Sequence, residues 1–378
     1  MGKKIVSLVS RQTIPNVEFI KAKKIGADRL VFITTETMEK QKKTDWILKS
    51  LGEDNGKRII VTETSISEIK AKLMQDFIYN KNDEILVNLT GGNKNMFLAA
   101  YEFFKEKGLN ECADVKMYYL NEGRNKFNMV FPNEQRECIN GGYCNLKEYL
   151  TAYSIEPKKP GMTPLMKFEK TLEFYKTIFI DKTEKTIINE IHKAVGNNID
   201  NFKELPKELS ANMGVRHLFE KVFGDFKEIT KPKIRYLTGS WFEEYVYFLI
   251  KRGLSLSNED IYLSLKMEDK SLVGNTADNE IDVIFIYNNK VNIIECKTGH
   301  KDGTGKSILQ NVLYKQSALQ KIFGLTAKSF LFLPDAISGS EHQKERAKVY
   351  SIDIVDDMNM LIDEDKFKRE FLNKFALL

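Results

Sequence analysis

The sequence is poor in the residues on which several classes of functional site depend. Its 378 residues include four cysteines and four histidines. The cysteines are Cys112, Cys138, Cys144 and Cys296. Their spacing is not that of zinc ligands and is typical of reduced thiols in a cytoplasmic protein. The histidines are scattered along the chain, which disfavours a histidine-based zinc site and a Ser-His-Asp triad.

Long apolar runs are missing as well. No stretch approaches the roughly 20 residues of a membrane-spanning helix, and residues 1–10 lack the apolar centre of a signal peptide. Hydrophobic residues make up 42% of the chain and charged residues 29%, as in a soluble globular protein. The net charge of +5 permits nucleic-acid binding without arguing for it. We therefore expect a cytoplasmic protein without membrane contact, whose length favours two domains and a connector.

A predicted hairpin over residues 279–297 carries the clearest chemistry. Two strand-like runs, EIDVIFIY and KVNIIECK, meet at Asn288-Asn289, and asparagine tolerates the positive φ of a two-residue turn. Both faces of the hairpin are largely apolar, which places it inside a sheet where isolated charges are unfavourable. Strict alternation would place four reactive side chains on the face of Ile284 and Ile286. These are Glu280, Asp282, Glu295 and Lys297.

Clustered carboxylates are the ligands that a hard divalent cation prefers. We expect Asp282 and Glu295 to hold Mn²⁺ or Mg²⁺, with Glu280 as a further acid. Lys297 would stabilise charge on a reacting phosphate. The alternative for these residues is a solvated strand end or a structural ion pair.

Asp282, Glu295 and Lys297 form a D…ExK pattern that resembles the PD-(D/E)xK nuclease superfamily. That fold has a helix before the hairpin, and residues 238–250 fit it, with Glu243 or Glu244 as an acid near the metal. Ser240 and Glu243 also have the spacing of a capping box, which would make Glu243 a helix-start residue instead.

A second helix is predicted after the hairpin, over residues 311–325. Its Tyr314, Lys315 and Gln316 would face the active site or bind the substrate backbone, and a solvated helix face is the alternative. The Gly-rich basic segment 297–307 lacks P-loop spacing and is interpreted as a mobile loop beside the site.

Residues 1–150 alternate strand and helix patterns, including a polar helix over 38–52, which predicts a Rossmann-like domain with a mostly parallel sheet. Two strand-to-helix turns stand out, SRQTIPN (10–16) and NLTGGNKNM (88–96). Ligands of such sheets bind beyond the carboxyl ends of the strands, and a glycine pair before a helix lets a phosphate approach. The alternative is a plain turn with a helix cap, since the segment is neither GxGxxG nor a Walker motif.

These two segments are similar to the ligand loops of the CRISPR-associated Rossmann-fold (CARF) domain. Together with the D…ExK pattern, the layout resembles the CARF nucleases, the ancillary effectors of type III CRISPR antiviral defence that cyclic oligoadenylate activates. The resemblance implies a homodimer that holds one cyclic tetra-adenylate across its twofold axis. It also implies these ligand residues: Ser10, Gln12, Thr13, Thr90, Gly91, Gly92, Asn93, Lys94 and Met96. Asn93 departs from the threonine common in the family, and Met96 has core packing as its alternative.

The predicted fold is therefore α/β throughout, with three parts. Residues 1–150 form the CARF domain, 151–233 a helical connector with a winged-helix-like module or a DNA-binding helix-turn-helix as alternatives, and 234–378 the nuclease domain with a mixed sheet. The expected activity is metal-dependent cleavage or nicking of DNA, RNA or both. A non-catalytic ring sensor and an enzyme that degrades the ring are the alternatives.

Overall fold

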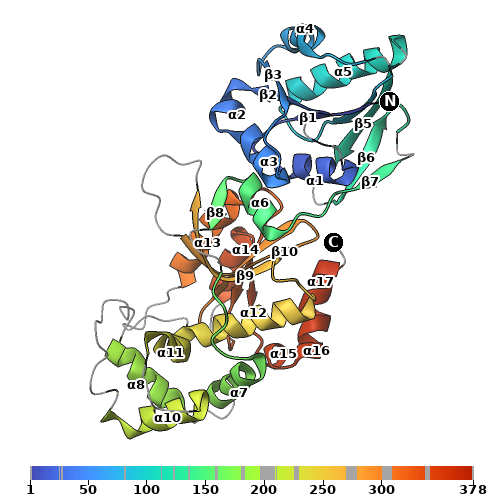
Figure 1. Ribbon diagram of the computed structural model, residues 1–378. Coiled ribbons are helices and arrows are strands. Elements are labelled where there is room, and N and C mark those ends of the chain that lie inside the picture. Colours follow the sequence, from blue (N-terminus) through green and yellow to red (C-terminus); the bar gives the residue numbers. More distant parts are fainter. Residues whose placement is uncertain are drawn as a thin grey trace.

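Two sheets follow one another along the length of the molecule (Figure 1). The computed structural model describes residues 2–376 apart from 25, 27–28, 81, 112, 122–123, 135–136, 158–160, 180–183, 196–208, 210, 225–229, 270–278, 300–308 and 337–340. Within these residues, no helix is both long enough and apolar enough to cross a membrane.

The first sheet forms the N-terminal domain, with the strand order β3-β2-β1-β4-β5-β6-β7. Its strands are β1 (Lys3–Leu8), β2 (Leu30–Thr35), β3 (Lys57–Val61), β4 (Glu84–Asn88), β5 (Asp114–Leu120), β6 (Lys126–Phe131) and β7 (Cys138–Asn140). β1 to β5 are parallel, and β6 and β7 are antiparallel. The chain order reverses between β1 and β4, which confirms the Rossmann-like arrangement and places a switch point between these two strands.

Helices cover both faces of this sheet. They are α1 (Ile14–Lys23), α2 (Glu36–Lys40), α3 (Lys43–Leu51), α4 (Ile66–Asp76), α5 (Lys94–Asn110) and α6 (Leu146–Ala152). α4 and α5 pack on one face, and α1, α3 and α6 lie on the side of the second sheet. The single helix expected over residues 38–52 is divided, because Lys42 adopts a left-handed conformation with φ 54° between α2 and α3.

The second sheet is mixed, as predicted, with the order β13-β12-β11-β10-β9-β8. Its strands are β8 (Ile155–Pro157), β9 (Ile261–Asp269), β10 (Asn279–Tyr287), β11 (Lys290–Cys296), β12 (Lys328–Phe332) and β13 (Ile352–Val355). β8 to β11 are antiparallel neighbours, and β11, β12 and β13 are parallel.

Helices before and after these strands complete the C-terminal half. They are α7 (Phe168–Phe179), α8 (Lys185–Val195), α10 (Met213–Phe223), α11 (Lys231–Arg235), α12 (Trp241–Gly253), α13 (Leu309–Ile322), α14 (Glu341–Val349), α15 (Met358–Leu361), α16 (Glu364–Phe367) and α17 (Asn373–Ala376). Two π-helical turns, Tyr236–Ser240 and Lys368–Leu372, join α11 to α12 and α16 to α17.

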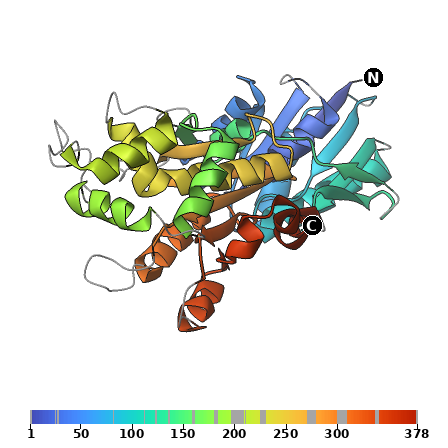
Figure 2. The same ribbon diagram turned by 90° about the horizontal axis from the view of Figure 1, so that it is seen from below.

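The connector is built against the C-terminal sheet. α7 packs on α12, with the rings of Tyr175 and Trp241 5.4 Å apart, and the two belong to one apolar core. Seen from below, the helices α7 to α12 lie together on one side (Figure 2). The described residues between 161 and 235 form helices and no strand, so the wing of a winged-helix module is not found in them.

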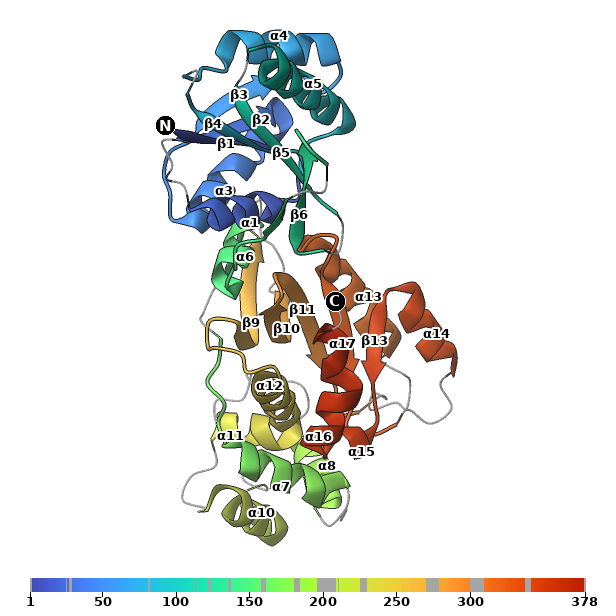
Figure 3. The same ribbon diagram turned by 90° about the vertical axis from the view of Figure 1, so that its right-hand side faces the viewer.

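A single apolar core, which we call the interdomain core, joins the two sheets. It contains Phe19 of α1, Tyr149 of α6, Ile284 of β10, Ile293 of β11 and Phe323 after α13, all of them buried. Figure 3 shows β9, β10 and β11 reaching α6 and α1 from below. The face of the hairpin that carries Ile284 and Ile293 is therefore buried against the N-terminal domain.

Candidate functional site

The hairpin of β10 and β11 folds as predicted. Asn288 and Asn289 form its turn with φ of 50° and 57°, and Tyr287 pairs with Lys290. The register continues regularly to the pair of Val283 and Ile294. Positive φ at both turn residues matches the right-handed twist of the strands, which explains the local strength of this signal.

The strict alternation predicted along β10 fails at Asp282. On the neighbouring strand Ser264 has a left-handed φ of 49°, and the register between β9 and β10 omits the position where Ser264 and Asp282 would pair. As a consequence Ile281 packs into the interdomain core, whereas Val283 packs beneath α12. Nothing in the local sequence signals this change of face.

The structure brings Asp282, Glu295 and Lys297 together at the end of the hairpin. Lys297 Nζ lies 2.7 Å from Glu295 Oε1 and 3.7 Å from Asp282 Oδ2. It also donates to the carbonyl oxygen of Cys296 at 3.1 Å, while the backbone N–H of Cys296 donates to Asp282 Oδ2 at 2.7 Å. Both carboxylates are buried, so their charges act at short range with little screening by water.

Negative charge is crowded in this cluster. Burial raises the pKa of Asp282 well above its usual value, and the carboxylates of Glu243 and Glu295 raise it further. Burial opposes the charged form of Lys297, but Asp282 and Glu295 outweigh it and raise the pKa of this ammonium group. The site therefore favours bound positive charge.

The two glutamates at the start of α12 have different surroundings. Glu243 accepts a hydrogen bond from Ser264 Oγ at 3.1 Å and lies close to the cluster, and burial raises its pKa to about 7. Glu244 instead accepts the backbone N–H groups of Leu165 and Met166 at 2.8 and 3.1 Å. Glu243, and not Glu244, is thus the acid that faces the site.

The capping box that was the alternative role for Glu243 is absent at the start of this helix. Ser240 makes no side-chain cap hydrogen bond and has helical backbone angles, because a π-helical turn runs directly into α12. Glu280, the remaining acid, lies at the exposed edge, 3.7 Å from Lys266.

The donor set fits a divalent cation. Asp282 and Glu295 offer buried carboxylate oxygens, and their mutual repulsion would be relieved by a cation near Lys297. Within the described parts of the chain, however, no three His, Cys, Asp or Glu side chains already stand in a ligating arrangement. Two carboxylates plus further oxygen donors would complete such a site.

The helix after the hairpin places the predicted substrate residues differently from one another. Tyr314 and Lys315 are exposed on α13. Gln316 is buried, and its amide Nε2 donates to the Phe330 carbonyl of β12, so this amide N–H₂ is bound within the fold. The substrate-binding role of Gln316 stays a prediction. Most of the predicted mobile loop, its residues 300–307, lies outside the described residues.

The two predicted ligand loops meet beyond β1 and β4. Asn88 Nδ2 donates to Asn16 Oδ1 at 2.9 Å, which links the ends of both loops. A Cβ atom on Gly91 would lie 2.0 Å from the Leu8 carbonyl oxygen, so only glycine fits at this position. Gly92 has a φ of 74°, a backbone conformation that favours glycine. Proximity of the loops thus depends on both glycines.

Residues of the second loop divide into exposed and structural ones. Asn93 caps α5 by accepting the Met96 N–H at 2.9 Å, and Thr90 Oγ1 accepts the Leu120 N–H at 3.0 Å. Lys94 is exposed beside them. Met96 is 1% exposed and packs in the core, which is the alternative role given for it above.

In the first loop, two of the three candidates contact the rest of the protein. Thr13 is buried and donates to the Ala152 carbonyl at 2.7 Å. The side-chain oxygen of Gln12 accepts the Tyr153 hydroxyl at 2.8 Å and the Leu325 N–H at 3.3 Å. Ser10 is half-buried and bonds within the loop. The loop is therefore connected directly to the C-terminal domain, which sequence reasoning missed.

The hairpin turn is a second direct connection. Asn289 Nδ2 donates to the Gly142 carbonyl at 2.9 Å, and Asn289 Oδ1 accepts the Cys144 N–H at 2.9 Å. One end of the hairpin is thus bound to the N-terminal domain, while the other end carries the acidic cluster.

The fold and this cluster define a protein that joins a Rossmann-like ligand-sensing domain to an endonuclease domain. Residues 5–149 match the Card1 CARF domain, and residues 230–367 match the Card1-like endonuclease domain. The chain therefore belongs to the family of CRISPR ancillary nucleases with this pair of domains. Among curated proteins, no match was found.

Solved structures share the fold across the whole chain. Can2 from Sulfobacillus thermosulfidooxidans, in complex with cyclic tetra-adenylate, has 18% identity and a TM-score of 0.71, with 99% of this chain and 100% of that chain covered. Protein VC1899 from Vibrio cholerae has 16% identity and a TM-score of 0.77, with 99% and 98% covered.

A third structure is a type III CRISPR defence DNA nuclease activated by cyclic oligoadenylate. It has 14% identity and a TM-score of 0.52, with 92% of this chain and 52% of that chain covered. At such identities these likenesses show the fold alone.

Proposed function

We propose that this protein is a metal-dependent nuclease that cyclic tetra-adenylate activates, with DNA as substrate and single-stranded RNA as a second one. The observation that carries the proposal is the contact of Asp282, Glu295 and Lys297 in one buried cluster at the end of the hairpin. A scaffold without catalysis has no need to bury two carboxylates so close together.

Asp282 and Glu295 would hold Mn²⁺ or Mg²⁺, and the bound cation would activate a water and neutralise charge on the phosphate. Lys297 Nζ would place its positive charge against a phosphate oxygen, because both carboxylates keep it protonated. Glu243 would orient water at the edge of the cluster, held in position by Ser264. Glu280 lies further out and would act through its charge alone.

The ring would bind where the two ligand loops meet, beyond β1 and β4, in a homodimer whose twofold axis matches the symmetry of the ring. The complex of Can2 with cyclic tetra-adenylate supports this choice of activator. Binding would act on the nuclease through Gln12 and through Asn289, since these two residues connect the domains. A ring that binds one interdomain arrangement better than another shifts the population toward it.

The decisive experiment is a cleavage time course on circular single-stranded DNA, supercoiled plasmid and single-stranded RNA. Each reaction would contain Mn²⁺, with and without cyclic tetra-adenylate. Wild type would be compared with Lys297→Ala and with Lys348→Ala, a matched loss of one lysine on the exposed surface of α14. We expect ring-dependent cleavage that Lys297→Ala reduces by at least about a hundredfold and that Lys348→Ala leaves unchanged.

Ring binding without cleavage by the wild type would refute the nuclease and favour a non-catalytic sensor. Loss of the ring over time in Lys297→Ala would reveal instead an activity on the activator itself. Chromatography of the ring in the same samples separates these cases.

A further inference from the structure

One residue of β9 has a backbone conformation that strands do not normally adopt. Ser264 has a φ of 49°, and among the residues that the structure describes it is the only one with a positive φ inside a strand. The others with positive φ lie at helix ends, in turns or in loops. Because positive φ is unfavourable for a residue that has a Cβ atom, such a residue inside a strand indicates a local demand on the backbone.

Both strands that meet at Ser264 change face there. Leu263 packs in the core beneath α12, whereas Leu265, two residues further on, packs in the interdomain core. In a regular strand, residues two apart share a face. β10 changes face at Asp282, as described above, and this is the position where Ser264 would pair. The two strands therefore turn over together at this pair.

The hairpin opens at the same place. Counted from its turn, the regular pairing of β10 with β11 ends one residue before Asp282. The Lys297 N–H bonds to the Phe332 carbonyl of β12, so the N–H of Cys296 points to the other side, toward β10. There it donates to Asp282 Oδ2 at 2.7 Å. The carboxylate of Asp282 thus lies in the gap between the two strands.

This gap matters because the two glutamates of the site come from opposite sides of the sheet. Glu243 belongs to α12, which packs on the face of Ile294 and Cys296. Glu295 alternates with those two residues along β11, so it belongs to the other face. Asp282, placed in the gap, is the acid that stands between the two glutamates.

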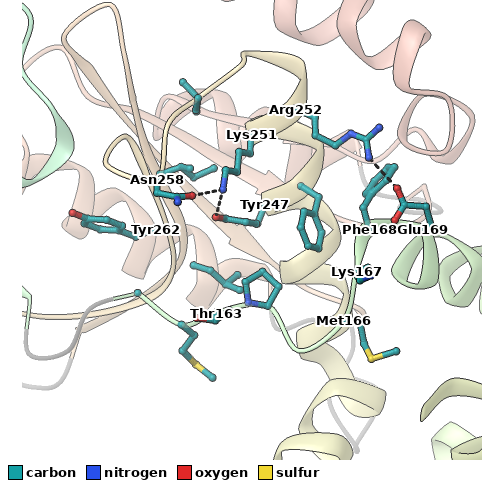
Figure 4. Close-up of a pocket in the computed structure, with 17 residues that line it drawn as sticks. Thr163, Met166, Lys167, Phe168, Glu169, Tyr247, Lys251, Arg252, Asn258 and Tyr262 are labelled. Atoms are coloured by element: carbon teal, nitrogen blue, oxygen red, sulfur yellow. Dashed lines mark hydrogen bonds and ion pairs between the residues drawn. The ribbon is translucent and has the colours of Figure 1, made fainter. Parts of the chain in front are cut away.

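The helix that carries Glu243 is fixed independently of the cluster. Lys251, about two turns further along α12, donates through Nζ to the Tyr247 hydroxyl at 3.1 Å and to Asn258 Oδ1 in the segment before β9 (Figure 4). This contact holds α12 against the start of β9. The Ser264 hydroxyl then donates to Glu243 Oε2 at 3.1 Å. The conformation of Ser264 therefore decides whether its hydroxyl reaches this carboxylate.

We propose that Ser264 is the positioning residue of the metal site and that its left-handed backbone is what places Asp282. The turn-over of β9 and β10 at Ser264 brings the Asp282 carboxylate into the gap, and the hydroxyl holds Glu243. Ser264 touches neither the cation nor the substrate and acts through these two acids. The proposal rests on the nuclease function given above and adds the residue that assembles its ligands.

Substitutions at residue 264 separate the backbone from the hydroxyl. Ser264→Gly removes the hydroxyl and favours the left-handed backbone, whereas Ser264→Thr keeps a hydroxyl and disfavours this backbone, because threonine is β-branched. Ser351→Thr is the matched control, since Ser351 is exposed before β13 and has a φ of 56°. Should Ser264→Thr fail to fold, Ser264→Ala takes its place, because alanine also disfavours positive φ.

The first measurement is Mn²⁺ binding to each full-length protein by isothermal titration calorimetry, without nucleic acid. Thermal melting checks that each variant is folded. Cleavage of DNA with Mn²⁺ and cyclic tetra-adenylate then gives kcat and KM. Metal affinity is the deciding quantity, because a purely structural role at this position would lower the melting temperature and leave the affinity of the folded protein unchanged.

We expect Ser264→Thr to weaken Mn²⁺ binding at least about tenfold, as is typical for residues that orient metal ligands. Ser264→Gly should keep its Mn²⁺ affinity within about threefold of wild type and lower kcat about fivefold with KM unchanged, since only Glu243 is released. Ser351→Thr should melt at a lower temperature, as Ser264→Thr does, with Mn²⁺ affinity and cleavage unchanged.

Wild-type Mn²⁺ affinity in folded Ser264→Thr would overturn the proposal, because the site would not depend on the left-handed backbone. Equal losses of Mn²⁺ binding in Ser264→Gly and Ser264→Thr would overturn it as well, in a wild type that binds Mn²⁺ and cleaves DNA. A wild type that neither binds Mn²⁺ nor cleaves nucleic acid would overturn the proposed function, and the role of Ser264 with it.

Discussion

Glu18 lies at the joint between the two sheets, and replacing it by glutamine tests the electrostatics of that joint. Its side chain is 3% exposed, and its Oε2 has no hydrogen-bond partner among the described residues. A side-chain hydrogen bond with Asn289 of the hairpin turn and the positive charge of Lys290 both lower the pKa of this carboxyl group. Burial outweighs both and raises the pKa of Glu18 from 4.5 to about 8.

The sign of the effect on stability follows from proton binding. Between pH 4.5 and about 8 the folded protein keeps the Glu18 proton that the unfolded chain releases, so stability falls as the pH rises through this window. At about 1.4 kcal/mol per pH unit, the raised pKa corresponds to an upper limit of about 5 kcal/mol, of which about 4 kcal/mol falls between pH 5 and pH 9. Glutamine resembles the protonated acid and removes this loss.

The assay is urea unfolding of wild type and Glu18→Gln at pH 5, 7 and 9, with Glu36→Gln on the exposed surface of α2 as control for the lost charge. We expect Glu18→Gln to be close to the wild type at pH 5 and more stable by a few kcal/mol at pH 9. Parallel stability curves for wild type and Glu18→Gln across this range would refute the reasoning, because they would show that Glu18 keeps an ordinary pKa in the folded protein.

Two further substitutions separate residues that the sequence groups together. In Glu244→Gln the new amide N–H₂ would face a backbone N–H of Leu165 or Met166, so we expect the free energy of unfolding in urea to fall by about 1–3 kcal/mol. Glu243→Gln should instead lower the cleavage rate, with a smaller effect on the free energy of unfolding. Gln12→Ala removes the oxygen that accepts hydrogen bonds from the Tyr153 hydroxyl and the Leu325 N–H between the two domains. We expect its affinity for the ring to stay within about threefold of wild type, whereas its cleavage rate at saturating ring changes by at least about fivefold. A large loss of ring affinity with unchanged cleavage at saturating ring would return Gln12 to the ligand role that the resemblance to the CARF domain implies.

The parts of the fold that the sequence predicts well are those that short segments determine alone. The Asn288-Asn289 turn and the strands on either side follow from local backbone preference and apolar pattern, and the structure has them in the predicted register. The Rossmann-like order of the N-terminal domain follows from the succession of strands and helices, whereas the mixed second sheet is what the resemblance to the PD-(D/E)xK superfamily implies.

The remaining details depend on contacts between distant segments. Gln316 is buried because β12 passes beneath α13 and offers the Phe330 carbonyl, which nothing around residue 316 indicates. Glu244 is distinguished from Glu243 only by the connector segment, which lies some 80 residues earlier in the chain. The roles of Asp282, Glu295 and Lys297 stay predictions, although the structure brings the three together.

The interdomain core has a consequence for engineering chimaeras from this protein. Ile284, Ile293 and Phe323 come from the C-terminal domain but are buried against side chains of the N-terminal one. A chimaera divided near residue 150 would expose these side chains to water, which costs about 1.5–3 kcal/mol of stability for each large side chain. Both fragments would then carry an exposed apolar patch that promotes aggregation. A transplantable version of the ligand-sensing domain would have to take the hairpin and the end of α13 with it, so the portable unit is larger than the domain.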